Sequence, residues 1–555
     1  MCGIVGYVGG QSAVPVLLEG LRRLEYRGYD SAGLATVTDR GVRVHKASGR
    51  VRDLEARLPR RLGGHTGIAH TRWATHGAPS DANAHPHVDG SGRIAVVHNG
   101  IIENGAELRA KLAADGVHLA SETDSEVLAH LIARSDASSL EGAVRAALGE
   151  VAGTYGLAVV DASRPDQIVA ARNGSPVVLG IGERETFVAS DVAALVRFTR
   201  QVVHLEDGEL AVVSRDGYRT ATLDEQVTTR SPTTVDVEAA HYERDGHPDF
   251  MHKEIHEQPV TLDRALRGRI DDRFASVVLG GVTLEPRQLR RIRRVTLLGC
   301  GSAYYAGELG ALLIEQLARI PADAQPAGEL GQRNAVVDPD TLYLAISQSG
   351  ETHDTLVAVD GLLRRGAQVL GVVNVVGSAL ARACGSGVYV HAGPEVSVTS
   401  TKTFTNTVAV LALLGVHLGR VRDLSPADGR RLLDGLRRLP PQVEEVLAME
   451  DQIAALAARL AEASSLLYVG RGRCWPVARE GAQKLKEVSY LHAEAYPASE
   501  LKHGPLALVS PAVPTVALLP NDELVSHNLA TVAEIRTRGG PVLALTTADL
   551  DPTQV

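Results

Sequence analysis

The 555-residue chain has few cysteines and no long apolar or basic run, and each absence excludes a class of protein. Its four cysteines, Cys2, Cys300, Cys384 and Cys474, are too scattered for a disulfide framework or a paired-cysteine metal site, which favours a reducing cytoplasm. No apolar stretch reaches the roughly 18 residues that span a bilayer. A net charge of -9 without a basic run predicts binding to neither nucleic acid nor an anionic membrane.

Length and composition predict several folded domains. A chain of this length exceeds a single hydrophobic core, and a prior of roughly 150 residues per domain gives three or four units. The composition, with 44% hydrophobic and 22% charged residues, is ordinary for a globular protein. The apolar start lacks the positive region of a signal peptide, so we expect a cytoplasmic protein.

The pattern along the chain divides it into four parts. Short strands such as 157–161 and 209–214 predict a mixed α/β domain over residues 2–225. The polar segment 228–246 shows no period and contains turn signals, so it predicts a linker. We therefore expect a linker with a leading helix at 226–285 and two further domains, at 286–425 and 455–555.

The two later domains look like copies of one fold. A strand ending in glycines at Gly301 recurs 171 positions later at Gly472, and other apolar runs follow at similar offsets. Apolar strands alternating with helical patterns predict two doubly wound, parallel αβα sheets. The second copy would need residues beyond Val555 for its last strand and helix, so we expect it to be incomplete.

Cysteine at position 2 is a candidate nucleophile. Removal of the initiator Met1 would place a thiol and a free α-amine on Cys2. The amine titrates near about 7.7–8.0 and the thiol near about 8.5, so the amine can accept the thiol proton at neutral pH. The dipeptide Cys2-Gly3 alone is a weak signal.

Three further features suit a site that binds a free amino acid beside a nucleophile, and each has a plainer interpretation. The pair Asn99-Gly100 after an apolar strand offers two donors to an oxyanion, but it also favours a type I′ hairpin turn. Arg72 suits an α-carboxylate and Asp124 an α-ammonium, yet each charge is also consistent with a surface ion pair.

The first domain resembles the class-II glutamine amidotransferase domain of glucosamine-6-phosphate synthases. The resemblance is carried by Met1-Cys-Gly-Ile-Val-Gly6, Leu24-Glu-Tyr-Arg-Gly-Tyr-Asp-Ser-Ala-Gly33, His70-Thr-Arg-Trp-Ala-Thr-His-Gly77, Asn83-Ala-His-Pro-His87, His98-Asn-Gly-Ile-Ile-Glu-Asn104 and Ser121-Glu-Thr-Asp124. It implies a four-layer αββα N-terminal-nucleophile (Ntn) hydrolase fold. The implied roles are nucleophile for Cys2, oxyanion hole for Asn99 and Gly100, glutamine carboxylate binding for Arg72, Thr75 and His76, amino-group binding for Asp124, and ammonia-channel gate for Trp73.

The hexapeptide Ser347-Gln-Ser-Gly-Glu-Thr352 is a candidate phosphate site. It follows an apolar strand and precedes a helical pattern, so hydroxyls and backbone N–H groups converge at a helix N-terminus. Gly350 leaves room for a ligand to approach. An ordinary Ser/Thr N-cap at Ser349 or Thr352 fits the same pattern equally well.

A second cluster of titratable groups lies at 480–505. Lys484 and Glu487 are three residues apart on one predicted helix face, and a carboxylate beside a lysine can move a proton between sugar carbons. His503 can exchange a ring-opening proton near neutral pH. A solvated helix with one salt bridge is the alternative.

These segments, with Val398-Thr-Ser-Thr-Lys402, resemble the isomerase half of the same synthases, which is built from two sugar-isomerase (SIS) domains. The resemblance implies that Glu487 shuttles the proton from C1 to C2 beside Lys484, and that His503 opens the sugar ring across a homodimer. It implies that the sugar phosphate is held by Ser347, Gln348, Ser349 and Thr352. It also implies that Val398 and Ser400 border the sugar and that Ser302 keeps one of the hydroxyls that bind the substrate.

The resemblance implies amination and isomerisation of fructose 6-phosphate with nitrogen from L-glutamine, without metal or cofactor. For His85 and His87 we favour a loop role over a metal site, since no third ligand accompanies them. The family's C-terminal tail, with its Schiff-base lysine, has no counterpart, and Ala303 replaces a usual hydroxyl. The alternative function is therefore a truncated relative with glutaminase activity and sugar-phosphate binding but impaired synthesis. An amidotransferase acting on phosphoribosyl pyrophosphate is disfavoured, because the sequence has no acidic pair at the start of a phosphoribosyl-binding loop.

Overall fold

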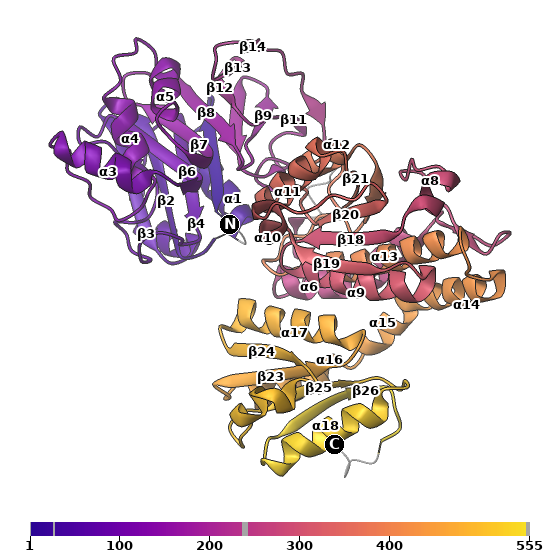
Figure 1. Ribbon diagram of the computed structural model, residues 1–555. Helices are drawn as coiled ribbons and strands as arrows, with labels where there is room; N and C mark the ends of the chain where they lie inside the picture. The colour runs from indigo at the N-terminus through magenta and orange to yellow at the C-terminus, as the bar shows by residue number, and fades with distance from the viewer. Residues whose placement is uncertain (1, 26–27, 236–241, 551–555) are drawn as a thin grey trace. The chain divides into compact units, whose positions relative to one another are not determined.

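The computed structural model describes residues 2–25, 28–235 and 242–550. Met1, part of the predicted linker (236–241) and the last five residues lie outside the described part. The chain forms two compact units, Met1–Glu243 and Arg244–Val555 (Figure 1).

The first unit contains two stacked antiparallel sheets. One has the order β15-β11-β9-β10-β1-β4-β2-β3 and the other the order β14-β13-β12-β8-β7-β6-β5. The strands of the first sheet are β1 (Gly3–Val8), β2 (Ser31–Thr38), β3 (Gly41–Ser48), β4 (Thr66–Arg72), β9 (Val178–Gly182), β10 (Glu185–Ala189), β11 (Gln201–His204) and β15 (Thr233–Thr234). Those of the second are β5 (His87–Val88), β6 (Ile94–Ile102), β7 (Gly153–Asp161), β8 (Gln167–Asn173), β12 (Glu209–Ser214), β13 (Gly217–Thr222) and β14 (Val227–Thr228).

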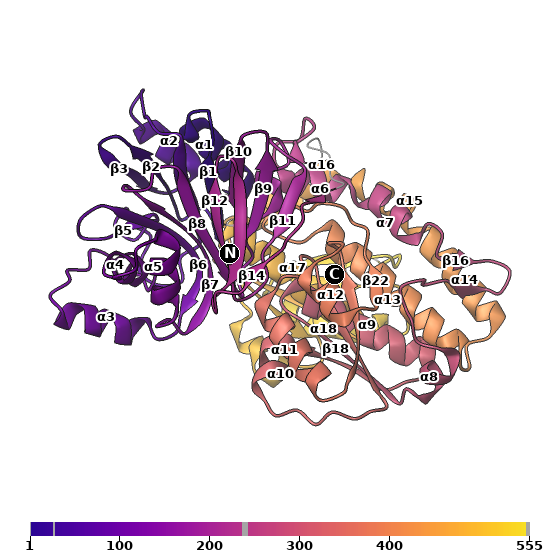
Figure 2. The same ribbon diagram turned by 90° about the horizontal axis from the view of Figure 1, so that it is seen from above.

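Helices cover the outer face of each sheet and complete the four layers (Figure 2). Helices α1 (Ala13–Leu24) and α2 (Val51–Arg57) bury leucines such as Leu17 and Leu54 against the first sheet. Helices α3 (Gly105–Ala114), α4 (Glu126–Ala133) and α5 (Leu140–Leu148) cover the second. Between the sheets lies a third core that includes Ile4, Ile68 and Val97. The alternating strand pattern thus produces an αββα sandwich, which confirms the predicted fold class for this part of the chain.

The second unit begins with two helices and contains a parallel five-stranded sheet of order β19-β18-β20-β21-β22. The elements are α6 (Phe250–His256), α7 (Gln258–Leu266), β16 (Ile270–Asp271), β17 (Ser276–Val277), α8 (Pro286–Arg291), β18 (Arg294–Gly299), α9 (Ser302–Ala318), β19 (Ala322–Pro326), α10 (Ala327–Gln332), β20 (Thr341–Ser347), α11 (His353–Arg364), β21 (Gln368–Val373), α12 (Ala379–Cys384), β22 (Gly387–Tyr389) and α13 (Lys402–Arg420). Helices α9 and α13 pack on one face, and α10, α11 and α12 on the other, so the sheet is doubly wound.

The predicted duplication is visible in the second parallel sheet, whose order β24-β23-β25-β26 repeats the first four positions of its predecessor. Helices α14 (Pro426–Arg437), α15 (Leu439–Leu447) and α16 (Glu450–Leu460) lead to β23 (Ser465–Gly470), α17 (Cys474–Ser489), β24 (His492–Pro497), β25 (Thr515–Leu519), α18 (Val525–Thr537) and β26 (Val542–Thr546). Two short 3-10 helices, Leu501–His503 and Pro505–Leu508, follow β24. Among the described residues this sheet has one strand fewer than the first.

Within the described part of the chain, no helix has both the length and the apolar character needed to cross a membrane.

Candidate active sites

Cys2 lies at the head of β1, which pairs with β10 and β4 inside the first sheet. The backbone N–H of Trp73 donates to the Cys2 thiol at 3.3 Å, and the Asn99 side-chain amide donates to the Cys2 carbonyl at 3.0 Å. Burial raises the pKa of the Cys2 thiol, against the opposing effects of the Trp73 N–H and the Arg72 charge. The thiol therefore needs a base to become a nucleophile near neutral pH. The predicted base is the α-amine that removal of Met1 would free, and Met1 lies outside the described residues.

His70 fixes the orientation of Asn99. Its Nε2 lies 3.0 Å from both Asn99 Oδ1 and the His98 carbonyl oxygen, so Nε2–H donates and the amide nitrogen of Asn99 faces Cys2. Burial lowers the pKa of His70 to about 3, which keeps the ring neutral. The sequence reasoning gave His70 no role. One sequence feature could have pointed to His70: it lies two residues before Arg72, and residues two apart lie on the same face of a strand.

Gly100 is part of strand β6 and not of a turn, so the hairpin alternative is wrong. Asn99 pairs with Gly156 and Gly100 with Tyr155 in the β6–β7 ladder. Gly100 has φ +134°, and a Cβ at this position would lie 2.1 Å from the Thr154 carbonyl oxygen. Only glycine fits here, which leaves its backbone approachable beside Asn99.

Replacing Asn99 by alanine is expected to lower kcat for glutamine hydrolysis by about 10²–10³-fold, the usual loss for one oxyanion donor. The KM for glutamine should change little, since Asn99 contacts Cys2 and not a substrate charge. Steady-state glutamate release measures both constants. The matched control is Asn104→Ala, because the Asn104 side chain bonds only the backbone of Glu150 and Ala152 among the described residues. Equal losses in both variants would contradict the assignment.

Arg72, at the end of β4, is 4% exposed, so the surface ion-pair alternative is wrong for this residue. Its Nη2 donates to the carbonyl oxygens of His76 and, at 3.0 Å, Gly77. Its buried Nη1 has no hydrogen-bond partner among the described residues. A buried guanidinium with an unused donor beside a thiol is what a bound carboxylate requires.

The other predicted glutamine contacts lie around this arginine. The backbone N–H of Ile102 donates to the Asp124 carboxylate at 2.8 Å. Thr75 and His76 are exposed and lie within 3.3 Å of each other, Oγ1 to Nδ1. Trp73 is 36% exposed, and its ring meets the Tyr29 ring edge-on.

Glu126 holds the loop that carries Asp124. Burial would raise the pKa of Glu126, but the nearby His130 and hydrogen bonds from the Ala120 and Ser121 N–H groups lower it to about 2. The carboxylate therefore stays charged and fixes the loop.

His85 and His87 are buried and bonded to protein groups. The His98 N–H donates to His85 Nδ1 at 3.2 Å, and His87 Nε2 lies 3.0 Å from the Thr123 hydroxyl. His85 lies in a loop, but His87 begins strand β5, so the loop expected for the pair is wrong for His87.

The loop after β20 has the geometry of an anion site. Thr352 occupies the N-cap position of α11, as the N-cap alternative expects, but its hydroxyl makes no capping hydrogen bond and lies 3.3 Å from the Ser347 hydroxyl instead. The Gly350 N–H donates to the Ser347 hydroxyl at 2.9 Å, and the Glu351 N–H to the Ser349 hydroxyl at 3.1 Å. The helix N-terminus thus keeps its own donors for a ligand.

Replacing Gly350 by alanine is expected to raise the KM for fructose 6-phosphate about ten- to a hundred-fold. Gly350 has φ +67°, and a Cβ there would lie 2.0 Å from the Ser378 hydroxyl, so the loop must move at a cost of about 1–3 kcal/mol. Gly361→Ala is the matched control, because Gly361 lies within α11 and its Cβ would meet nothing within 4 Å. A Gly350→Ala enzyme with an unchanged KM would contradict the assignment.

Lys484 joins the two parallel-sheet domains of the second unit. Its ammonium lies 2.9 Å from the Glu487 carboxylate and donates to the Ser302 hydroxyl at 3.1 Å, at the N-terminus of α9. A second carboxylate, Glu480, lies 3.3 Å from Lys484, and burial raises its pKa against the effect of that lysine. The side chain of Lys484 is 17% exposed, so the solvated-helix alternative is wrong for Lys484. Glu480 was missed by the sequence reasoning, although its spacing of four from Lys484 was a signal.

His503 does not join this cluster within one chain. Its side chain is exposed, and among the described residues it has no hydrogen bond to Lys484 or Glu487.

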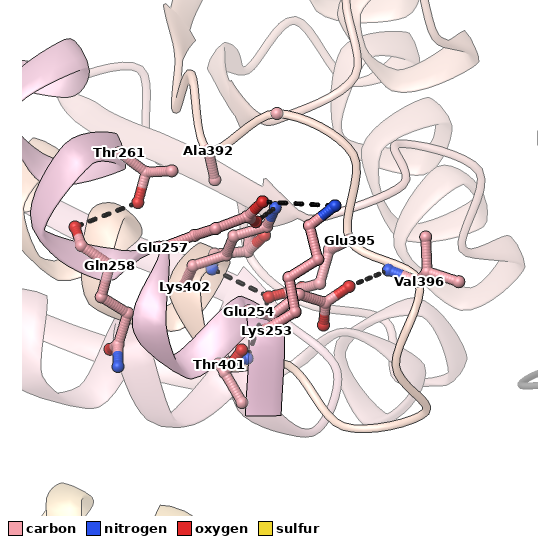
Figure 3. A network of polar contacts seen from close by, with 12 residues as sticks. Lys253, Glu254, Glu257, Gln258, Thr261, Ala392, Glu395, Val396, Thr401 and Lys402 are labelled. Carbon is pink, nitrogen blue, oxygen red and sulfur yellow. Dashed lines mark hydrogen bonds and ion pairs between the residues drawn. The ribbon is translucent and has the colours of Figure 1, made fainter. Parts of the chain in front are cut away.

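The loop 393–401 carries Val398 and Ser400 and is hydrogen-bonded to two carboxylates (Figure 3). Glu254 on α6 accepts hydrogen bonds from the N–H groups of Val396 and Ser397. Glu395 accepts from the Ser400 hydroxyl at 3.1 Å. Burial and the nearby Glu395 charge raise the pKa of Glu254 to about 7. Val398 is left 42% exposed at the loop surface, where a ligand can reach it.

Two family models match the chain. That of the glutamine amidotransferase domain matches residues 70–197, and that of the SIS domain matches residues 288–417 and 459–554. An Ntn-type αββα unit with Cys2 at the head of a central strand, followed by two doubly wound sheets, defines a glutamine amidotransferase joined to sugar-isomerase domains.

The relatives are similar over nearly the full chain. It is 46% identical over 553 residues to the glutamine–fructose-6-phosphate aminotransferase (isomerizing) of Chlorobaculum tepidum, covering 98% of this chain and 90% of the relative. It is 48% identical over 549 residues to the protein of the same name from Thermus thermophilus, covering 99% and 90%. The solved C-terminal domain of the Francisella tularensis glucosamine-fructose-6-phosphate aminotransferase is 33% identical, with a TM-score of 0.53, covering 55% of this chain and 85% of that one. The chain belongs to the family of isomerizing glutamine–fructose-6-phosphate aminotransferases.

Proposed function

We propose that this chain transfers the amide nitrogen of L-glutamine to fructose 6-phosphate, yielding glutamate and glucosamine 6-phosphate. The proposal rests on the presence of two sites in one chain. In one, Cys2 lies near buried Arg72, which has an unused hydrogen-bond donor; in the other, Lys484 contacts Glu487 and Ser302. The comparisons give no support to the alternative of a relative with impaired synthesis.

In the first half-reaction, the Cys2 sulfur attacks the side-chain amide carbon of glutamine. Asn99 and Gly100 stabilise the oxyanion, Arg72, Thr75 and His76 hold the α-carboxylate, and Asp124 holds the α-ammonium. Collapse of the intermediate breaks the C–N bond and releases ammonia. Water then cleaves the thioester to glutamate and returns the thiol.

In the second half-reaction, the serine loop at the α11 N-terminus and Ser302 hold the phosphate, and Val398 and Ser400 border the sugar. Ammonia adds to the C2 carbonyl, water leaves, and Glu487 moves a proton from C1 to C2 to give the amino aldose. Lys484 lies 2.9 Å from the Glu487 carboxylate and positions it by a charge-assisted hydrogen bond.

The site is complete only in a homodimer, in which the partner subunit supplies His503 as ring opener. The exposed position of His503, away from Lys484, supports this arrangement. The four cysteines are free thiols, which supports a reducing cytoplasm as the site of action.

The proposal is tested by incubating the full chain with glutamine and fructose 6-phosphate and measuring both products. Equal amounts of glutamate and glucosamine 6-phosphate are expected. Glutamate formation without the amino sugar would refute it.

A further inference from the structure

A histidine-carboxylate cluster lies outside both reaction sites. His252 and His256 are one turn apart on α6, and Glu450 is the first residue of α16. His252 Nε2 lies 2.7 Å from one Glu450 oxygen and His256 Nε2 lies 3.1 Å from the other. The three ligand atoms all lie within 4.8 Å of one another. Two elements nearly 200 residues apart in sequence thus converge on one point.

The chemistry of the three groups is that of a divalent-cation site. Two imidazoles four residues apart on a helix present their Nε2 atoms to the same point, the spacing found in helical zinc-binding motifs. Two imidazoles and a carboxylate, with a fourth position open to water, are a common zinc ligand set. The three side chains are 30–49% exposed, so an ion can enter from solvent.

A fourth residue, His247, orients the first. Its Nδ1 lies 2.7 Å from His252 Nδ1, so the two rings share one hydrogen bond and His252 Nε2 is held toward Glu450. Metal-bound histidines usually have such a partner on the second ring nitrogen.

We propose that His252, His256 and Glu450 bind a divalent cation of the zinc type, which clamps α6 to α16. In helical zinc hydrolases the general base directly follows the first histidine of the motif, and here that position is Lys253, so the cluster lacks a hydrolytic base. The clamp instead stiffens α6, the helix that supports the sugar loop. The cluster contains none of the residues proposed for the reaction, and plain imidazole-carboxylate hydrogen bonds are the competing account.

The test is calorimetric titration of ZnCl₂ into the chelator-stripped full chain. One ion per chain is expected, with a rise in Tm, and Mg²⁺ should not compete, because it prefers oxygen ligands. His252→Ala and Glu450→Gln should each weaken binding at least about 100-fold and abolish the Tm rise, and His247→Ala about tenfold. If His252→Ala does not fold, His252→Gln replaces it in the same titration, with the same expected loss of binding. The matched control, His527→Ala on α18, changes an exposed histidine and should bind as the parent does.

Co²⁺ substitution separates this site from the cysteines. The expected absorption is that of tetrahedral Co²⁺ with nitrogen and oxygen ligands, lost in Glu450→Gln. Absence of saturable binding would overturn the proposal. So would a sulfur-to-metal charge-transfer band, or binding that His252→Ala and Glu450→Gln leave unchanged, because the ion would then lie elsewhere.

Discussion

Replacing Cys2 by alanine is expected to lower glutamine hydrolysis by more than about a thousandfold, because the nucleophile itself is lost. Synthesis of glucosamine 6-phosphate from fructose 6-phosphate and added ammonium salt should continue at the parental rate. The two assays, glutamate release and ammonium-driven synthesis, are run on the same preparation. The split arises because Cys2 belongs to the first compact unit, whereas the sugar residues belong to the second.

Cys384→Ala is the matched control for Cys2. Burial raises the pKa of the Cys384 thiol to about 11, and the residue lies at the end of α12, where it has no proposed part in either reaction. Parental glutaminase activity is expected. Residual glutaminase activity above a tenth of the parent in Cys2→Ala would exclude Cys2 as the nucleophile.

Replacing Glu487 by glutamine is expected to lower synthesis by about 10²–10⁴-fold, the range for loss of a general base. The substitution keeps the size of the side chain and its contact with Gln483, but it removes the charge beside Lys484. Glutamine hydrolysis should persist. In D₂O the parental enzyme should exchange the C1 hydrogen of fructose 6-phosphate, and Glu487→Gln should not.

Glu494→Gln controls for loss of a glutamate in the same domain. Glu494 lies on β24 and forms an ion pair with Lys486 at 3.2 Å, and both side chains are substantially exposed. Loss of this pair should lower the free energy of unfolding by about 1 kcal/mol at most and leave synthesis unchanged. Retained C1 exchange in Glu487→Gln would assign the proton transfer to another group, and Glu480, which lies 3.3 Å from Lys484, would be the first to examine.

The architecture of the second unit could be predicted because its signals are local. Strand β18 ends at Gly299 and β23 at Gly470, the same 171-residue offset that the glycines of the sequence showed. Parallel strands between helices need no long-range information beyond this periodicity. The two stacked sheets of the first unit came from the resemblance, since alternation alone does not show which strands pair.

The site residues that belong to sequence motifs could be predicted, whereas those brought together by tertiary packing could not. Cys2, Asn99 and Arg72 stand in recognisable motifs, whereas the hold of His70 on Asn99 joins β4 to β6, strands of different sheets. How one sheet lies on another follows from side-chain packing over the whole core, which no short segment encodes. The support of the sugar loop by Glu254 likewise spans 142 residues.

The central claim is that one polypeptide passes nitrogen from a Cys2 glutaminase to a Glu487 isomerase. It is tested most directly by supplying glutamine labelled with ¹⁵N in its side-chain amide together with fructose 6-phosphate, and analysing the sugar product by mass spectrometry. The account predicts that the amino sugar carries the ¹⁵N label and accumulates in step with glutamate. Labelled ammonia accumulating in solution while no labelled amino sugar forms would contradict it.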